Sequence, residues 1–330
     1  MQFLIDIWNS GEIWLTAHIF APLVAGLGVG AIIDDPRDIA QYLMIACAQV
    51  LIIGCVFRPL ESIAPIEEWT DRGRTNIDRF YTILKELGLV PLFTFGILLP
   101  LSALGEHLLG GGSGGEAKSL PDWIPWFADK PLLVFGIYFA AFDLTAYIIH
   151  RLQHALPWWW AMHSLHHSQT HVNCWTDDRN HMIDDCLEAL IQGAVAVAIG
   201  VPAGQYALLI LIGRLIENFS HANVRFYYGR FIDKLFVDPK FHRLHHMKAD
   251  PAEPDLHNCN FALVLPIWDI LFRTALYGRD VRPCGVDDPA IDKDNELSWW
   301  GQQVAVFKRL MKALKRTPMP DQMGRREPAE

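Results

Sequence analysis

Long runs without charged side chains dominate the first half of the 330-residue chain. A helix needs roughly 20 apolar residues to cross the hydrocarbon core of a bilayer. Four runs approach or exceed this length, and Asp143 is the only acidic, lysine or arginine residue within them: residues 13–33, 39–57, 87–105 and 131–149. We therefore predict that each of these runs forms a membrane-spanning helix.

A fifth apolar run, residues 189–213, is interrupted by Gly-Val-Pro at residues 200–202. Glycine and proline disfavour a helix interior, so this run predicts a helical hairpin, or two half-buried helices, in place of one straight span. Between residues 299 and 314, large apolar side chains recur at helical spacing among lysines and arginines. That pattern predicts an amphipathic helix lying on the membrane surface or packed on the protein's own cap. The polar tail after residue 318 is predicted to be disordered.

The distribution of basic residues predicts how the chain is oriented in the membrane. The segment after the second run carries Arg58, Arg72, Arg74, Arg79 and Lys85, whereas the segment after the third run carries only Lys118 and Lys130. Cytoplasmic loops are enriched in lysine and arginine. The first segment is therefore expected in the cytoplasm, together with the N-terminus, the end of the fourth run and the long segment after residue 213.

Composition excludes several classes of protein. The formal net charge is -9, and no basic face interleaved with aromatic residues is present, so nucleic acid is not an expected partner. The six cysteines show no CxxC spacing, which predicts reduced thiols and neither a disulfide framework nor a zinc ribbon. The first nine residues lack the basic region of a removable signal peptide. The GGGSGG stretch at residues 110–115 lacks the context of a phosphate-binding loop and is expected to be a flexible connection.

Three histidine clusters carry the candidate chemistry. They are His150 with His154, then His163 with His166 and His167, and finally His242 with His245 and His246. On a helix, residues three and four positions apart share a face, so each cluster presents its imidazoles in one direction. One metal ion takes about four to six ligands, so eight imidazoles suggest two ions.

The spacing of these clusters resembles that of the fatty acid hydroxylase / sterol desaturase superfamily of membrane di-iron oxygenases. Asp143 and Tyr147 precede His150 as in the family's D-x-x-x-Y-x-x-H-R-x-x-H run. Residues 220–223 (Ser-His-Ala-Asn) resemble the family's additional histidine between the second and third boxes.

The end of the histidine-rich region extends the resemblance. Residues 260–262 (Asn-Phe-Ala) and 268–274 (WDILFRT) are similar to the family's closing N-[YF]-G and WDxLFGT elements. Ala262 and Arg273 stand where the family usually has glycine, which affects the local backbone and not the histidines. The resemblance covers residues 131–275, whereas the first 130 residues resemble the family only in being hydrophobic.

The resemblance implies O2-dependent hydroxylation or desaturation of a lipid C–H bond at a pair of iron ions held by the eight histidines. It adds His221 as a ninth ligand and His181, in an Arg-x-His element, as a further candidate. The residues themselves favour iron over zinc, because catalytic zinc usually keeps three protein ligands and no HExxH motif is present.

Asp143 is the one acidic residue inside the fourth predicted span. It lies two helical turns before His150 on nearly the same face, and a carboxylate within a membrane is costly unless it has a role. Metal-bound histidines usually donate their other ring N–H to an acceptor. We therefore expect Asp143 to accept a hydrogen bond from a ligand histidine. Asn223, Asn260 and Asp269 are further residues that could support the histidine helices by hydrogen bonding.

Together these features predict an all-α integral membrane bundle of about four transmembrane helices plus a hairpin, with a cytoplasmic helical cap that carries the histidines. Three regions are expected: a transmembrane region at 1–130, the fatty acid hydroxylase-like histidine region at 131–275, and a C-terminal interfacial helix and tail at 276–330. The expected location is a bacterial inner membrane, with the active site on the cytoplasmic face.

The expected substrate is a fatty acyl, sterol, carotenoid or ether lipid that enters from the bilayer. The sequence shows no flavin, nicotinamide or haem fingerprint, so electrons are expected from a separate reductase, ferredoxin or cytochrome b5-like protein. Two other classes stay open: a zinc-dependent membrane hydrolase, and a non-catalytic metal-binding or transport protein. A transporter would place its ligands at mid-membrane on several spans, whereas these histidines gather towards one face.

Overall fold

The computed structural model describes residues 2–30, 35–69, 73–89, 118–248 and 258–315. These residues form helices joined by loops and include no β-strand, only an isolated bridge between Met247 and Cys284. The prediction of an all-helical fold is confirmed over them. Most of the predicted third span, the glycine-rich stretch at 110–115 and the C-terminal tail lie outside the described residues.

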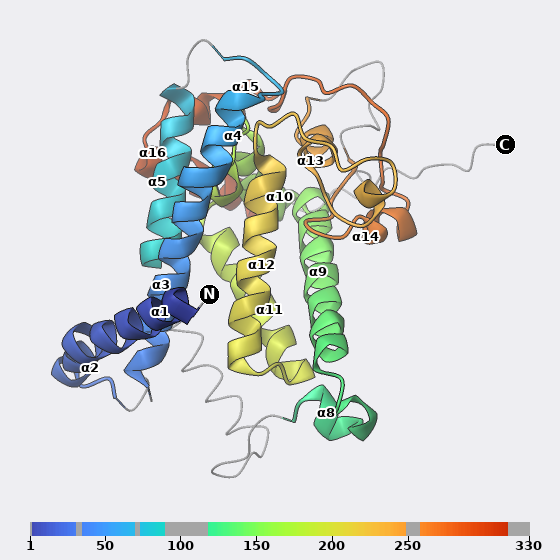
Figure 1. Cartoon of the computed structure of the whole chain (residues 1–330). Helices are drawn as coiled ribbons and strands as arrows, with labels where there is room; N and C mark the ends of the chain where they lie inside the picture. The colour runs from blue at the N-terminus through green and yellow to red at the C-terminus, as the bar shows by residue number, and fades with distance from the viewer. Residues whose placement is uncertain (1, 31–34, 70–72, 90–117, 249–257, 316–330) are drawn as a thin grey trace.

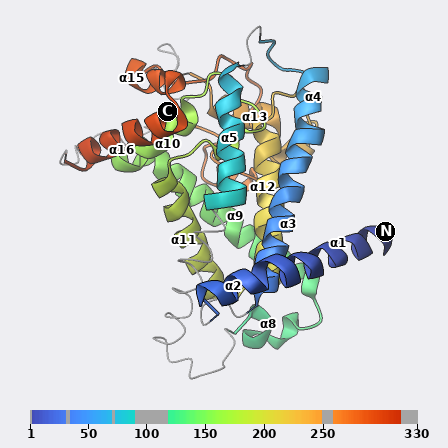
Figure 2. The same cartoon turned by 90° about the vertical axis from the view of Figure 1, so that its left-hand side faces the viewer.

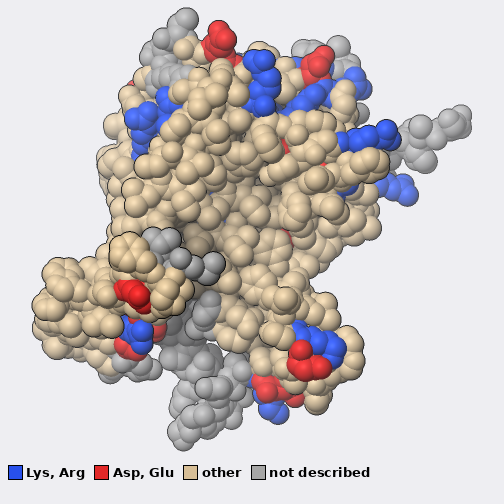
Figure 3. All heavy atoms as spheres, viewed as in Figure 1, with Lys and Arg blue, Asp and Glu red and all other residues tan. Residues whose placement is uncertain are grey.

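Among the described residues, two segments are long and apolar enough to cross a bilayer. The first joins α3 (Pro36–Ile52), the π-helical turn η2 (Ile53–Phe57) and α4 (Arg58–Ile63), and the second is α9 (Pro131–Ala155). Both run along the long axis of the molecule (Figure 1). On the face shown in Figure 3, most charged residues lie near the two ends, and the band between them shows few charged residues. This surface suits a protein embedded in a membrane between two aqueous layers.

The interrupted fifth run forms the predicted hairpin. α11 (Met182–Ile199) ends at Gly200, whose φ of 65° lies in the left-handed region, and α12 (Ala203–His221) returns towards the cap. The hydroxyl of Tyr138 on α9 accepts from the Leu120 backbone N–H at 2.9 Å and donates to the Gly200 carbonyl at 3.3 Å. The bend of the hairpin is thereby tied to α9 at the end of the bundle opposite the cap.

The N-terminal run differs from a simple span. It is divided among α1 (Gln2–Leu15), the π-helical turn η1 (Thr16–Phe20) and α2 (Ala21–Leu27), and it ends at Gly28, before residue 33. These helices lie across α3 instead of along it (Figure 2). Glu12 explains the arrangement: it is buried, forms an ion pair with Arg37 and accepts a hydrogen bond from Gln41 at 3.1 Å, which fixes α1 beside the start of α3.

The cap forms at the end of the bundle where α9 and α12 finish. Its helices are α10 (Pro157–His167), α13 (Pro239–His245), α14 (Ile267–Leu271), α15 (Pro289–Asp292) and α16 (Trp299–Lys315), with α5 (Asn76–Leu84) beside them. The short helix α8 (Leu120–Trp123) lies at the opposite end. The segment after α4 and the ends of α9 and α12 therefore share one end of the molecule.

The C-terminal helix α16 packs on the cap through one face. Val306 and Leu310 join a buried cluster with Met162 and Leu165 of α10. Gln302 and Gln303 are also buried on this face and bond to the hydroxyl of Tyr81. Of the two positions expected for the amphipathic helix, packing on the cap is thus observed, while Trp300, Phe307, Met311 and Leu314 remain exposed on its other side.

Replacing Gly200 with alanine is expected to destabilise the hairpin. The left-handed backbone already disfavours a side chain, and a Cβ would lie 2.0 Å from the carbonyl oxygen of Lys118. We expect a loss of about 1–3 kcal/mol in the free energy of unfolding, measured in detergent. Gly136→Ala on α9 is the matched control, because no atom lies within 4 Å of its Cβ position. Equal stability of the two variants would contradict this account of the turn.

Candidate metal centre

Within the described part of the chain, nine histidines converge at the cap end of the bundle in two groups. The first histidine group comprises His150, His154, His163, His167 and His245, and the second comprises His166, His221, His242 and His246. Within each group, one ring nitrogen from every member lies within 4.8 Å of the others. The structure thus brings together the eight histidines of the three sequence clusters and His221.

The two His-x-x-His-His motifs divide their side chains between the groups in complementary ways. On α10, His163 and His167 enter the first group, while His166 enters the second. In the second motif, at α13 and its C-cap, His245 enters the first group, while His242 and His246 enter the second. In each motif, the first and last histidines are four residues apart and share a helix face. The middle histidine, His166 or His245, points to one side of that face. The groups therefore lie side by side, and the rings of His167 and His246 stack with centroids 4.5 Å apart.

Ring nitrogens face each other within both groups at distances that suit a shared cation. The Nε2 atom of His167 lies 3.0 Å from that of His154 and 3.2 Å from that of His245. In the second group, the Nε2 atom of His221 lies 2.9 Å from that of His242 and 3.2 Å from that of His246. Two nitrogens about 2.0–2.1 Å from one ion stand roughly 3.0–3.4 Å apart. The observed spacing is close to that of nitrogens on a common ion.

Hydrogen bonds at Nδ1 of three of these rings determine the tautomer, and so leave a lone pair on the facing Nε2 atom. Nδ1 of His150 donates to the carbonyl of Phe261 at 2.8 Å, and Nδ1 of His245 donates to that of Cys259 at 2.7 Å. Nδ1 of His221 donates to the carbonyl of Glu217 at 2.8 Å. A neutral imidazole that carries its proton on Nδ1 has only a lone pair on Nε2. Facing lone pairs repel, so a cation between them stabilises the arrangement.

Buried ring nitrogens without hydrogen-bond partners support the same interpretation. Among the described residues, Nε2 of His150 and both ring nitrogens of His163 are buried and make no hydrogen bond. A buried polar atom without a partner costs free energy, and metal coordination would satisfy it. The donor set therefore fits metal ions. It consists of imidazole alone, which suits iron, copper, nickel and zinc, and neither group contains a carboxylate.

Burial keeps these imidazoles neutral. It lowers the pKa of His163 to about 3 and that of His221 to about 4. Burial also lowers the pKa of His166 and His242 well below the usual value, and neighbouring histidines lower it further. Neutral imidazole is the form that binds a metal ion, so burial prepares the nitrogens for coordination.

Asp143 does not accept a hydrogen bond from a histidine, so the predicted contact is wrong. Its carboxylate accepts from the backbone N–H groups of Val264 and Leu265, at 3.1 and 3.0 Å, and from the indole of Trp268 at 2.8 Å. The reason is that the segment from Val264 to Trp268, which includes the start of α14, lies beside α9 and offers three donors close to the carboxylate. Asp143 therefore holds the loop whose Phe261 carbonyl accepts from His150.

The same loop is held by two of the other predicted supporting residues. Asp269 accepts from the backbone N–H groups of Phe261 and Ala262 at 2.9 and 2.8 Å. The side chain of Asn260 donates to the carbonyl of Phe241 on α13 at 2.8 Å. Arg273, in place of the family's usual glycine, adopts the left-handed conformation with a φ of 59°.

His181 lies outside both histidine groups. Its Nδ1 accepts from the backbone N–H of Ile183 at 3.2 Å and caps α11, and its Nε2 lies 3.2 Å from the carbonyl of Gln303. The structure therefore gives both nitrogens other contacts, and His181 acts as a helix cap here. The neighbouring Arg179 serves the site more directly, because it is buried, donates to the carbonyl of Leu165 at the end of α10, and pairs with Asp78 on α5 at 3.0 Å.

Sequence reasoning missed two acidic residues behind the histidines. Asp184 lies 3.7 Å from Nδ1 of His163, and Asp177 lies 3.6 Å from Nδ1 of His221. Burial raises the pKa of Asp184 to about 6 and also raises that of Asp177. The adjacent aspartates at 177–178 and 184–185 could have indicated these carboxylates from the sequence, but adjacent acidic residues usually lie on a solvated surface.

A buried ionic cluster continues from Asp177 into the bundle. Lys85 lies 3.3 Å from Asp178 and 3.1 Å from Asp185, and Arg214 lies 3.7 Å from Asp177. These side chains join the segment after α5 to α11 and α12. The cluster thereby ties the helices of the hairpin to the loop that follows α10.

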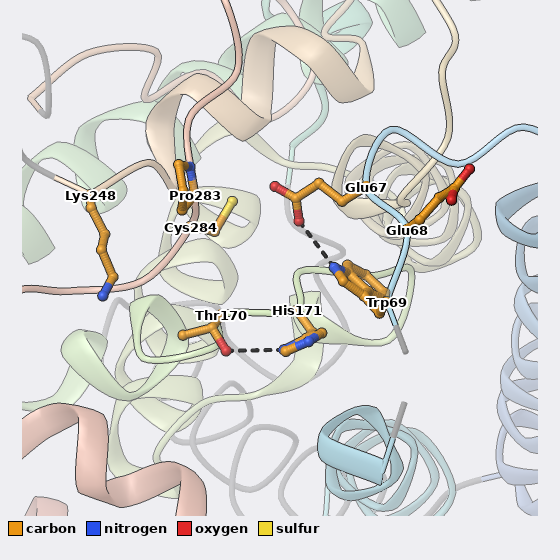
Figure 4. A pocket seen from close by; sticks show the side chains of 8 residues that line it. All are labelled: Glu67, Glu68, Trp69, Thr170, His171, Lys248, Pro283 and Cys284. Carbon is orange, nitrogen blue, oxygen red and sulfur yellow. Dashed lines mark hydrogen bonds between the residues drawn. The ribbon is translucent and has the colours of Figure 1, made fainter. Parts of the chain in front are cut away.

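A pocket of about 490 Å³ lies on the cap beside the histidine groups. Figure 4 shows Lys248, Pro283 and Cys284 on one side, Glu67 and Trp69 on the other, and Thr170 and His171 between them. The indole of Trp69 donates to Glu67 at 3.1 Å. None of the nine histidines lines this pocket, so it adjoins the metal centre without being part of it.

The histidine-rich region is similar to known proteins. Residues 135–274 match the family model for fatty acid hydroxylase. The chain is 28% identical over 236 residues to ornithine lipid hydroxylase OlsE of Rhizobium tropici, an alignment that covers 69% of this chain and 65% of that protein. It is 26% identical over 176 residues to alkylglycerol monooxygenase of Caenorhabditis elegans, covering 51% of this chain and 30% of that protein.

The chain spans less than two thirds of the length of either relative. No solved structure matches it.

The affinity of the site for a divalent metal ion is expected to change little between pH 7.5 and 5.5. An ordinary imidazole has a pKa near 6.5, so at pH 5.5 protons would lower affinity about tenfold for each ligand. With pKa values of about 3 and 4 for His163 and His221, protons compete only at lower pH. Competition between the detergent-purified, metal-free protein and a coloured chelator for Co2+ measures this. A loss of several orders of magnitude at pH 5.5 would show that the imidazoles titrate normally.

Asp143→Ala is expected to destabilise the protein as well as weaken metal retention. The substitution leaves two backbone N–H groups and one indole without their buried acceptor, at about 1–3 kcal/mol for each. Asp143→Asn keeps one carbonyl acceptor, so this variant should lose less stability and less metal than Asp143→Ala. The thermal midpoint and the metal content are measured together on both variants. Metal loss at an unchanged midpoint would favour a direct contact with a histidine over support of the loop.

Proposed function

Because residues 135–274 belong to the fatty acid hydroxylase family, we propose that this chain is an O2-dependent oxygenase that hydroxylates a C–H bond of a membrane lipid with two iron ions. The observation that carries the proposal is the pair of adjacent all-histidine groups at the cap end of α9. Nine imidazoles in two groups supply enough ligands for two ions, with four or five nitrogens each.

The first histidine group would hold one iron and the second group the other. Bound iron would supply the redox chemistry with O2 that an unactivated C–H bond requires. The chain's own residues orient and shield the site. The carbonyls of Phe261, Cys259 and Glu217 hold three imidazoles with their lone pairs turned inward, and burial of the rings keeps water away.

The overall reaction would convert R–H, O2, two electrons and two protons into R–OH and water. The electrons and protons come from outside the substrate, which supports the proposal of a separate electron donor such as a reductase, a ferredoxin or a cytochrome b5-like protein. Both relatives are named for the insertion of oxygen, as a hydroxylase and a monooxygenase, so hydroxylation is proposed ahead of desaturation.

The proposed substrate is a polar lipid whose acyl or alkyl chain reaches the site from the bilayer. The relatives are named for ornithine lipid and alkylglycerol, which share a polar headgroup and long chains. His150 and His154 lie in the final turns of an apolar helix long enough to span the membrane, so a chain lying against this helix would reach the site without crossing water. We further propose a multi-pass protein of a bacterial inner membrane with this end of the bundle in the cytoplasm.

Metal analysis and lipid mass spectrometry test the proposal together. The purified protein should contain two irons per chain, and cells that express it should contain a lipid heavier by one oxygen atom. His245→Ala and His242→Ala remove one member of each group. Both should lose iron, and their activity should fall by more than the roughly 10–100-fold typical of losing a residue behind a ligand.

His18→Gln is the matched control, because His18 lies on η1 and outside both histidine groups. It should keep both iron and activity. One zinc ion per chain with an unchanged lipid extract would refute the oxygenase and favour a metal-dependent hydrolase.

A further inference from the structure

Two segments of the cap expose large apolar side chains beside the end of α9. They are residues 225–236, between α12 and α13, and residues 265–273, which include α14. Phe231 and Leu235 in the first segment are 76% and 59% exposed, and Leu271 in the second is 61% exposed. Such exposure is costly in water, and a contiguous patch of this kind marks a surface that contacts a partner or a membrane. We call the two segments together the lip.

The segments of the lip form one surface that continues onto α9. The backbone N–H of Val237 donates to the carbonyl of Val264 at 2.9 Å, just beyond the ends of the two segments. Phe272 stacks on Tyr147 of α9 with ring centroids 5.4 Å apart. Ile148, on the next position of α9, is also exposed. The apolar surface of the spanning helix therefore runs directly into the lip.

The exposed charges of the lip are all basic. Arg225, Arg230 and Arg273 are exposed and Lys234 is half-buried, whereas the two acidic residues of the lip, Asp233 and Asp269, are buried. Asp233 accepts from the hydroxyl of Tyr227 at 3.1 Å, and Asp269 accepts from backbone N–H groups. Burial of both acids leaves a positive outer surface in a chain whose net charge is -9.

Two of the basic groups lie against aromatic rings. The guanidinium of Arg230 lies 5.3 Å from the centre of the Phe231 ring, and the ammonium of Lys234 lies over the ring of Tyr277. Aromatic rings and long basic side chains are enriched where a protein meets the headgroup layer, because one end of each is apolar and the other polar. This pairing suits a surface that is partly in hydrocarbon and partly among headgroups.

We propose that the lip inserts its apolar side chains into the bilayer interface and binds anionic lipid headgroups through Arg230 and Lys234. The inference rests on the membrane location in the proposed function and extends it to a lipid-binding surface. Insertion of the lip would place the ends of α9 and α12, and therefore the histidine groups, close to the level of the headgroups. A lipid chain leaving the adjoining leaflet would then meet His150 and His154 first.

Charge favours lipid over a second copy of the chain. A symmetric dimer through the lip would bring its like charges together, which is unfavourable unless acidic partners separate them. Anionic phosphates instead complement the basic side chains, at a strength of about fivefold in affinity for each lysine or arginine near the surface. The apolar residues between the basic ones would contact the lipid acyl chains next to these phosphates.

Photo-crosslinking in nanodiscs tests the proposal on the full-length protein. The discs contain phosphatidylcholine with phosphatidylglycerol, and each lipid in turn carries a diazirine probe. Peptides from residues 225–236 should crosslink to phosphatidylglycerol in preference to phosphatidylcholine. In Arg230→Gln/Lys234→Gln, this preference should fall about fivefold for each charge removed. In Phe231→Ser/Leu235→Ser, crosslinks to a probe within the acyl chain should be largely lost.

Lys293→Gln and Leu297→Ser are matched controls, because both residues are exposed on the cap outside the lip. Neither should change the crosslinks of residues 225–236. Equal crosslinking to both lipids in the wild type, or crosslinks from the lip to a second copy of the chain, would overturn the proposal. Iron content is measured on the same samples. Lip variants that retain two irons but lose lipid crosslinks support the lip, whereas a wild type that lacks iron refutes the proposed function without affecting the crosslinking result.

Discussion

The central constraint of the structure is that the Nε2 lone pairs of neutral histidines face one another in a buried site. The Nε2 atoms of His221 and His242 lie 2.9 Å apart, and the hydrogen bond from Nδ1 of His221 to the carbonyl of Glu217 leaves only a lone pair on its facing nitrogen. Burial removes water that would satisfy these nitrogens and lowers their pKa, so protonation does not relieve the repulsion. A metal ion does so, which connects the packing of the cap to its chemistry.

Much of the surrounding polar core serves to keep those rings in position. Backbone carbonyls, which do not titrate, accept hydrogen bonds from the histidines. Buried carboxylates in turn hold the segments that carry these carbonyls. Asp143 and Asp269 fix the loop that contains Phe261, and Arg179 fixes the end of α10. Each carboxylate is itself expensive to bury, but several donors compensate it. The site is therefore supported by parts of the chain that are far apart in the sequence.

Periodicity and spacing predicted the parts of the fold that depend on local interactions. Apolar runs predicted α3 and α9, and Gly200 with Pro202 predicted the turn between α11 and α12. The N-terminal run was less predictable, because its direction depends on the ion pair between Glu12 and Arg37 and not on its own hydrophobicity. Asp143 was assigned to a histidine from helical spacing and from the cost of a carboxylate within a membrane, whereas a loop more than a hundred residues later supplies its backbone donors.

By itself, the sequence determined that helices would form, that the runs containing α3 and α9 are apolar enough for a membrane, and that three histidine clusters share helix faces. These properties follow from the 3.6-residue repeat and from side-chain polarity, which act within a few turns. Only the tertiary structure decided that each His-x-x-His-His motif is shared between two groups, that His221 joins the second and that His181 joins neither. Those outcomes depend on the angles at which α9, α10, α12 and α13 meet, and such angles are set by packing between residues far apart in the chain.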